Sequence, residues 1–165
     1  MIVVADASPL NCLIQISCEG VLGRLYDLVL VPSGVFEELH RPSAPPSVLS
    51  WVSEPPDWMR VHLVKAPVDP LLSMLDPGER EAIQLAEEQK ADLLLIDEQR
   101  GRLEAKRRGL AVTGTLGVLL AAGRRGFIDA EASFYSLVET TTFRASPGVR
   151  ENYLALCRQL RRKSH

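Results

Sequence analysis

The sequence predicts an α/β protein, with a three-layer α/β/α fold built around a mainly parallel sheet of about five strands. Two observations carry this prediction. Short runs rich in Val, Ile and Leu alternate along the chain with amphipathic helical segments, as in βαβ units. Most of these runs are continuously apolar, which is typical of parallel strands covered on both faces. At 165 residues the chain is long enough to bury a substantial core, and we predict a single domain spanning 1–165.

The first 75 residues contain the first predicted strands and most of the prolines. The predicted elements of residues 1–40 are a strand at 2–5, a helix that ends near Gly20, a helical turn that reaches Tyr26, a strand at 28–31 and a short helix at 33–40. Residues 42–77 hold 8 of the 11 prolines. We therefore predict a proline-rich irregular insertion at 41–75, which contains a helical turn at 47–52 and a half-exposed strand at 59–65.

A strong helix start follows the insertion. Asp76 is a good N-cap, Pro77 suits the first helical position, and Glu79 completes a capping-box pattern. The predicted elements from there on are a helix at 79–90, a strand at 91–97, a basic helix at 101–109, a strand at 110–115, helices at 116–126 and 129–139, and a basic C-terminal helix at 147–163.

Charge is distributed unevenly along the chain. Residues 1–99 carry 16 acidic and 6 basic residues, whereas residues 100–165 carry 5 acidic and 13 basic ones. An acidic half that needs a cation, joined to a basic half that can hold a polyanion, explains this pattern; solvated helix faces explain it equally well. The three cysteines have no metal-ligand spacing, which indicates reduced thiols. No membrane span or signal peptide is recognisable, so we expect a cytoplasmic protein with no membrane attachment.

Two of the apolar runs end abruptly in an acid. Asp6 follows the strand at 2–5, and Asp97 closes the run that begins at Leu93. Aspartate is a poor strand former, and in parallel sheets ligands bind beyond the carboxyl ends of the strands. Each aspartate has an alternative interpretation as the N-cap of the helix that follows it. The occurrence of both at the same edge of the sheet favours a functional site.

Two glutamates on helices are candidates to join these aspartates. At about 100° per residue, Glu79 lies roughly 40° from the centre of the apolar face of its helix. Its alternative role is the capping box alone, and the two roles are compatible. Glu38 borders the apolar face of the helix at 33–40, whereas Glu37 points away. A solvated acidic pair explains Glu38 equally well.

A cluster of four carboxylates requires either protons or a cation. Oxygen ligands without His or Cys suit Mg²⁺ or Mn²⁺, and such ions activate water for phosphodiester hydrolysis without a protein nucleophile. Small polar side chains that can orient metal-bound water, or act as helix caps, are Ser8, Asn11 and Thr115, the last at the end of its predicted strand. Asp97 is followed by Glu98, which is either a ligand or a neighbour.

These motifs resemble the PIN-domain family of metal-dependent ribonucleases, which includes toxins of prokaryotic toxin–antitoxin pairs. The resemblance is carried by VADASPL, VPSGVFEEL, LDPGEREAIQLA, LLLIDEQRGR and VTGTLGVLLAAGRRGFI, which together span residues 3 to about 128. By position, the four family acids correspond to Asp6, Glu38, Glu79 and Asp97. The third acid is Glu here, where many family members have Asp. The detailed motifs are similar to those of stand-alone prokaryotic PIN proteins.

The sequence and the resemblance together predict a metal-dependent endoribonuclease. Asp6, Asp97 and Glu79 are the expected metal ligands, and Glu38 completes the catalytic pocket. The residues expected to steer the RNA backbone are Arg100, Arg102, Lys106, Arg107 and Arg108, unless they form an ordinary solvated helix face. The resemblance also implies a homodimer and, for a toxin, an antitoxin whose Arg or Lys enters the acidic pocket.

Other functions fit the sequence less well. The main alternative is a non-catalytic binding or regulatory module with the same fold. An aspartate-based phosphatase needs a second Asp two residues after the first, where Ser8 stands. A receiver domain needs a Lys at the end of a late strand, and none follows the strand at 110–115. The basic residues also lack the interleaved aromatic side chains of a single-strand binder.

Overall fold

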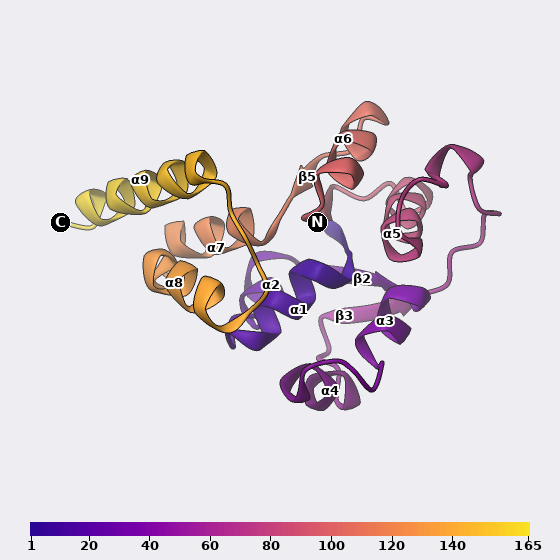
Figure 1. Ribbon diagram of the computed structural model, residues 1–165, viewed down its shortest axis with the longest axis horizontal. Helices are drawn as coiled ribbons and strands as arrows, with labels where there is room; N and C mark the ends of the chain where they lie inside the picture. Colours follow the sequence, from indigo (N-terminus) through magenta and orange to yellow (C-terminus); the bar gives the residue numbers. More distant parts are fainter.

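The computed structural model describes all 165 residues and confirms the predicted fold class. Five strands form one all-parallel sheet in the order β3-β2-β1-β4-β5 (Figure 1). The strands are β1 (Ile2–Ala5), β2 (Leu28–Pro32), β3 (Met59–His62), β4 (Leu93–Leu95) and β5 (Val112–Thr113). The chain builds the sheet outward from β1 in one direction and then returns to add β4 and β5 on the other side. The strand order therefore reverses between β1 and β4.

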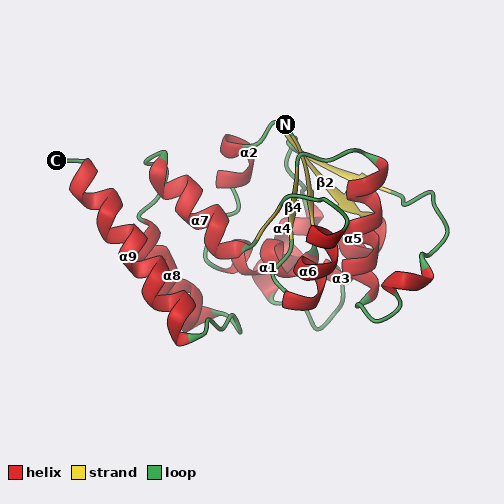
Figure 2. Cartoon of the chain, turned by 90° about the horizontal axis from the view of Figure 1, so that it is seen from above, coloured by secondary structure: helices red, strands yellow, loops and turns green.

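Nine α-helices and one 3₁₀ turn surround the sheet. They are α1 (Ala7–Gln15), α2 (Val21–Leu25), α3 (Ser33–Leu39), α4 (Pro46–Ser53), η1 (Pro70–Leu72), α5 (Pro77–Glu88), α6 (Gln99–Arg107), α7 (Thr115–Arg124), α8 (Ala130–Thr140) and α9 (Pro147–Lys163). Helices α7, α8 and α9 extend to one side of the sheet and carry the C-terminus away from it (Figures 1 and 2). No helix combines the length and apolar composition that crossing a membrane requires.

Side chains of the central strands alternate between the two faces of the sheet and so contribute to two separate cores. Val3 and Ala5 point into a large cluster with residues of α1, α2, α3, α4, α7, α8 and α9, whereas Val4 points into a smaller cluster with residues of α5 and α6. Successive side chains of a strand face opposite sides of the sheet, so an uninterrupted apolar run fills both cores. This three-layer arrangement is the one that the continuous Val, Ile and Leu runs predict.

The two clearest differences from the predicted boundaries concern the first helix and the last strand, whereas the elements predicted within the proline-rich segment are found where expected. The first helix ends at Gln15 rather than near Gly20, because Ser17 adopts a left-handed backbone conformation with φ of 57°. The strand predicted at 110–115 is only two residues long, and Thr115 opens α7 instead of closing a strand. The proline-rich segment 41–75 contains α4 and the edge strand β3, at the places where the sequence predicts a helical turn and a strand.

Candidate active site

The reversal of strand order brings Asp6 and Asp97 to the same edge of the sheet. Ala5 and Leu95 are paired in the β1–β4 register, and the Asp6 N–H donates to the Leu95 carbonyl at 2.9 Å. Asp6 therefore lies one residue beyond the paired end of β1, and Asp97 lies two residues beyond that of β4. A switch in strand order at the carboxyl edge is the usual ligand-binding position of an open α/β sheet.

Asp6 is a buried carboxyl group in an acidic environment. Only 5% of the residue is exposed, and burial raises the pKa of its carboxyl group from 3.8 to about 7. The backbone N–H of Ala7 opposes this rise, whereas the charges of Glu79, Glu38 and Asp97 add to it. Asp6 occupies the N-cap position of α1 without making a side-chain cap hydrogen bond. The capping interpretation therefore does not account for its placement.

The carboxylates of Asp6 and Glu38 converge at the first turn of α5. A Cβ atom at Gly78 would lie 3.1 Å from Glu38 Oε2 and 3.2 Å from Asp6 Oδ1. Both oxygens thus approach one point that is open because position 78 carries no side chain. Glycine is a poor helix former, so its position inside α5 indicates a need for space. Sequence reasoning treated this glycine only as part of a capping pattern.

Glu79 has one occupied and one unoccupied carboxylate oxygen. The backbone N–H of Asp76 donates to Glu79 Oε2 at 3.1 Å, as the capping box predicts. The other oxygen, Oε1, is buried and has no hydrogen-bond partner. Burial raises the pKa of the Glu79 carboxyl group, and the charges of Asp76, Glu98 and Glu38 raise it further. The capping role and a binding role are therefore compatible, because each uses a different oxygen.

Asp97 is held by Thr115 at the start of α7. The backbone N–H and the hydroxyl group of Thr115 donate to Asp97 Oδ1 and Oδ2, each at 2.7 Å. Burial raises the pKa of the Asp97 carboxyl group, and the two hydrogen bonds from Thr115 and the charge of Arg102 oppose that rise. Asp97 thus interacts with the N-terminus of α7, whereas Glu98 occupies the N-cap position of α6. Thr115 is fully buried and acts as the donor that fixes Asp97.

The other residues predicted to support the site form no hydrogen bond to its four acids. Ser8 is half-buried and lies beside Asp97 in the wall of a shared cleft. Asn11 Oδ1 accepts a hydrogen bond from Gln15 Nε2 at 2.6 Å, one turn further along α1. Glu98 is exposed and acts on the site through its charge on Glu79. A residue that sequence reasoning missed is Glu81, whose Oε2 accepts from the Gly34 N–H at 3.0 Å and so ties α5 to the helix that carries Glu38.

The five basic candidates divide into two groups. Arg102 lies at the acidic site, because its Nη1 donates to the Ile96 carbonyl at 3.0 Å and its charge lowers the pKa of Asp97. Arg100 and Lys106 are exposed, as expected of residues that contact a polyanion. Arg107 pairs with Glu104 at 2.8 Å. Arg108 is the least available of the five.

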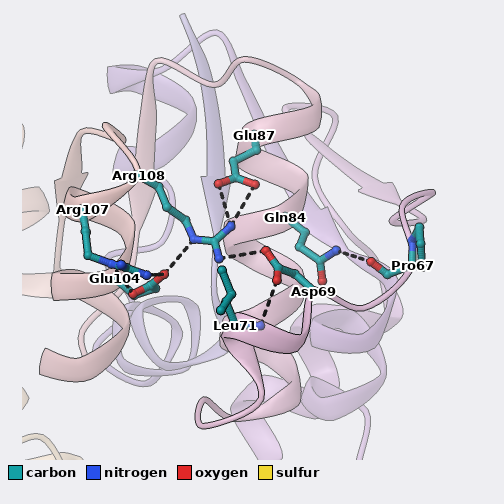
Figure 3. A network of polar contacts seen from close by, with 8 residues as sticks. All are labelled: Pro67, Asp69, Leu71, Gln84, Glu87, Glu104, Arg107 and Arg108. Carbon is teal, nitrogen blue, oxygen red and sulfur yellow. Dashed lines mark hydrogen bonds and ion pairs between the residues drawn. The ribbon is translucent and has the colours of Figure 1, made fainter.

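Arg108 is enclosed by three carboxylates, as Figure 3 shows. Its guanidinium group contacts Asp69 and Glu87 at 2.8 and 3.0 Å, and Glu104 at 2.9 Å. These pairs join α6 to α5 and to the segment before η1, which the hydrogen bond from Gln84 to the Pro67 carbonyl also holds. The structure therefore gives Arg108 a role in packing that its place in a basic run did not indicate.

The donor set fits a hard divalent cation in part. All four acids offer oxygen atoms as ligands, and Glu79 Oε1 has no hydrogen-bond partner that would compete with a metal ion. However, no group of three His, Cys, Asp or Glu side chains is close enough to ligate one ion together. Mg²⁺ usually keeps several waters and uses only one or two protein carboxylates. Asp6 and Glu38, which meet at Gly78, are the pair best placed for such a site.

Comparison with known proteins identifies the family of this chain. A family model described as a PIN domain matches residues 2–159. A search of curated proteins finds no significant match.

The raised pKa values predict how stability depends on pH. Between about pH 4 and pH 7, the native state keeps a proton on Asp6 that the unfolded chain has released. Stability of the metal-free protein should therefore fall as the pH rises through this window, and the raised pKa values of Glu79 and Asp97 act in the same direction. Thermal unfolding in EDTA should give a lower midpoint at pH 8 than at pH 5.

The Asp6→Asn variant provides the control for this prediction. It should reduce the pH dependence and raise the midpoint at pH 8 by a few °C, since ~1 kcal/mol corresponds to ~2–4 °C in a chain of this size. A wild-type midpoint that rises steadily from pH 5 to pH 8, or a variant with an unchanged slope, would contradict the placement of Asp6.

A second pair of variants separates packing from RNA contact. Arg108→Ala should lower the unfolding midpoint by several °C, because three carboxylates lose their shared partner, and should leave the RNA affinity of the folded protein unchanged. Arg102→Ala should weaken RNA binding in EDTA. A large loss of RNA affinity in Arg108→Ala at a temperature where it remains folded would show that Arg108 contacts RNA.

Proposed function

The chain belongs to the PIN-domain family, and from this premise we propose that it is a metal-dependent endoribonuclease that hydrolyses RNA phosphodiester bonds. PIN domains are generally nucleases and usually use divalent metals, so a nuclease-type hydrolase is the activity that the family supports. The observation that carries the proposal is the convergence of Asp6 and Glu38 at Gly78, with the unpartnered Glu79 Oε1 in the same acidic cluster.

We assign the metal-binding role to Asp6, Glu79 and Asp97, with Glu38 completing the catalytic set. Mg²⁺ or Mn²⁺ in this site supplies charge neutralisation and the activation of water for attack on phosphorus. The four carboxylates would hold the cation and the water between them, so that no protein nucleophile would be needed. Thr115 keeps Asp97 in a fixed orientation by two hydrogen bonds, and Ser8, Asn11 and Glu98 are supporting residues at the margins of the cluster.

Protonation of Asp6 links metal binding to pH. Burial raises the pKa of its carboxyl group to about 7, so the metal-free protein holds a proton there below neutral pH. A carboxylate must lose this proton to act as a ligand, so binding should tighten as the pH rises toward 8.

Binding of the substrate is assigned to the cationic residues nearest the acids. Arg102 reaches the edge of the site, and Arg100 and Lys106 extend the positive surface along α6. Contacts from these residues to phosphates position RNA without reading its sequence, and salt weakens them. Arg107 and Arg108, which pair with Glu104, contribute to the fold of this surface instead.

The toxin role extends this proposal to partners. A toxin of this family would form a homodimer and would be inhibited by an antitoxin whose Arg or Lys enters the acidic pocket. The acids here suit such a contact, because Asp6, Glu38 and Glu79 form a partly buried cluster with no basic side chain paired to any of them. A cation from a partner would neutralise the same charges that a metal neutralises.

A non-catalytic binding module is the second candidate, and one observation favours it. Three acids do not reach a common ligand position, so the cluster has no preassembled metal cage. If the acids do not close around an ion, the same fold serves only to bind RNA or protein.

Cleavage of a mixed panel of labelled RNAs in Mg²⁺, Mn²⁺ and EDTA distinguishes the two candidates. Wild-type protein should cut in the presence of either metal and not in EDTA. Asp97→Asn should reduce the rate by more than the roughly 10–100-fold typical of changes around a metal ligand. The matched control is Asp57→Asn, which alters an exposed aspartate outside the site and should leave the rate unchanged. Equal rates in Asp97→Asn and wild type would contradict the assignment.

Variants of Thr115 test how Asp97 is held. Thr115→Val removes the hydroxyl donor to Asp97 Oδ2 while keeping the shape of the side chain. The rate of metal-dependent cleavage should fall about 10–100-fold, and the metal concentration for half-maximal rate should rise. Thr115→Ser keeps the hydroxyl group and should retain most of the activity. Similar losses in both variants would indicate that packing, rather than the hydrogen bond, is responsible.

A further inference from the structure

A cleft of about 640 Å³ is lined in part by Asp97. It is formed between α1, the start of α6, the turn from β5 to α7, the segment 142–146 that connects α8 to α9, and the first turn of α9. Its volume falls in the ~300–1,000 Å³ range of small-molecule sites. Asp97 and Ser8 line it, whereas Asp6, Glu38 and Glu79 do not. The cleft is thus a separate space that shares one wall with the acidic cluster.

The walls of the cleft combine charged side chains of both signs with apolar surface, since Asp97 and Glu98 line it beside two arginines. Arg102 lines it from α6 and Arg144 lines it from the α8–α9 segment, and neither guanidinium group forms an ion pair with a carboxylate. Arg144 is held by its own segment, since its Nη1 donates to the Phe143 carbonyl at 2.8 Å. Leu116, Phe143 and Val149 supply the apolar part of the lining. Two arginines that form no ion pair, beside an apolar surface, suit a ligand with phosphate groups and a planar ring.

We infer that this cleft binds one nucleotide of the RNA substrate next to the scissile phosphate. Arg102 and Arg144 hold its phosphates, and its base rests against the apolar surface of Leu116 and Phe143. This inference rests on the proposed function, because the shared wall at Asp97 places the nucleotide beside the reacting phosphodiester. Single-stranded RNA fits this description, since its unstacked bases are free to enter pockets and pack on aromatic side chains.

The α8–α9 segment is built to keep its residues in place. The Ser146 side chain accepts from the Val149 N–H and caps α9, and the Thr141 hydroxyl accepts from the Phe143 N–H. Phe143 packs against the main core at the same time. A wall fixed at both ends loses little conformational entropy when a ligand binds, which is a property of preorganised sites.

An NMR titration with adenosine 3′,5′-bisphosphate in EDTA tests the inference without cleavage. Saturable shifts should appear at the amides of Gly114, Gly117, Phe143 and Arg144, all of which line the cleft. Inorganic phosphate alone should bind at least about tenfold more weakly, because it lacks the base. Shifts confined to other parts of the protein, no saturable shift, or equal affinity for phosphate would each overturn the inference.

Variants of the cleft provide a second test. Arg144→Ala should weaken binding of the bisphosphate about fivefold to tenfold, as expected for the loss of one charge-assisted hydrogen bond. Val149→Trp, at an exposed position on the rim, should block the cleft and abolish the shifts. The matched control is Arg158→Ala, which removes an exposed arginine of α9 that does not line the cleft and should bind normally. Normal binding by both cleft variants would overturn the inference.

Cleavage assays on the same variants separate this inference from the proposed nuclease activity. Arg144→Ala should raise the KM for RNA with little change in kcat, whereas Asp97→Asn should lower kcat. Metal-dependent cleavage with an unchanged KM in Arg144→Ala would remove the subsite and retain the nuclease. Saturable nucleotide binding by a protein that cuts no RNA would retain the cleft as a nucleotide site and remove the nuclease.

Discussion

Repulsion among buried carboxylates is the constraint on which the arrangement of this protein depends. Asp6 and Glu79 are each at most 6% exposed, and the charge of Glu38 raises the pKa of both carboxyl groups. Like charges at low dielectric cannot all remain ionised without compensation. Part of the compensation comes from helix N-termini, where backbone N–H groups and the helix dipole favour anions. Asp97 accepts from the first N–H of α7, and Glu81 accepts from an N–H at the start of α3.

The remaining repulsion has two chemical solutions, a proton or a cation. In the metal-free protein we place the proton on Asp6, because burial raises the pKa of its carboxyl group to about 7. In the proposed metal-bound state, a divalent cation would take the place of that proton. Burial of mutually repelling charges therefore explains both why the acids do not meet at one point and why the pKa of Asp6 is high. Both describe a cluster whose charges are not yet balanced, which is the state that favours binding of a cation.

The sequence predicts the parts of this site that depend on strand pattern. Asp6 and Asp97 follow continuous apolar runs, and parallel pairing places the ends of such runs at one edge of the sheet, so their common location follows from the pattern alone. The capping box of Glu79 is also local, because Asp76 is only three residues away. The sequence does not indicate which carboxylate oxygen of Glu79 lacks a partner once the capping box has formed.

Contacts between distant segments lie beyond the reach of pattern reasoning. The approach of Glu38 to Gly78 depends on how α3 packs against α5, and no periodicity encodes that angle. Arg108 looks like a solvated basic residue until Asp69, 39 positions earlier in the chain, is placed beside it. The strand predicted to end at Thr115 ends two residues earlier, at Thr113. Thr115 therefore begins α7 instead of closing a strand.

Asp97 links the two halves of the proposed site because its surroundings differ on its two sides. Towards the sheet it adds to the negative field on Asp6, and towards the cleft it lies near the cation Arg102. Gly114 makes this possible, since a Cβ atom there would lie 2.6 Å from Asp97 Oδ1 and 2.9 Å from Arg102 Nη1. In the proposed complex, a phosphodiester that spans this position would meet carboxylates on one side and guanidinium groups on the other. The reacting phosphate of the proposed substrate would require a cation to approach the acids, whereas its neighbouring phosphate would not.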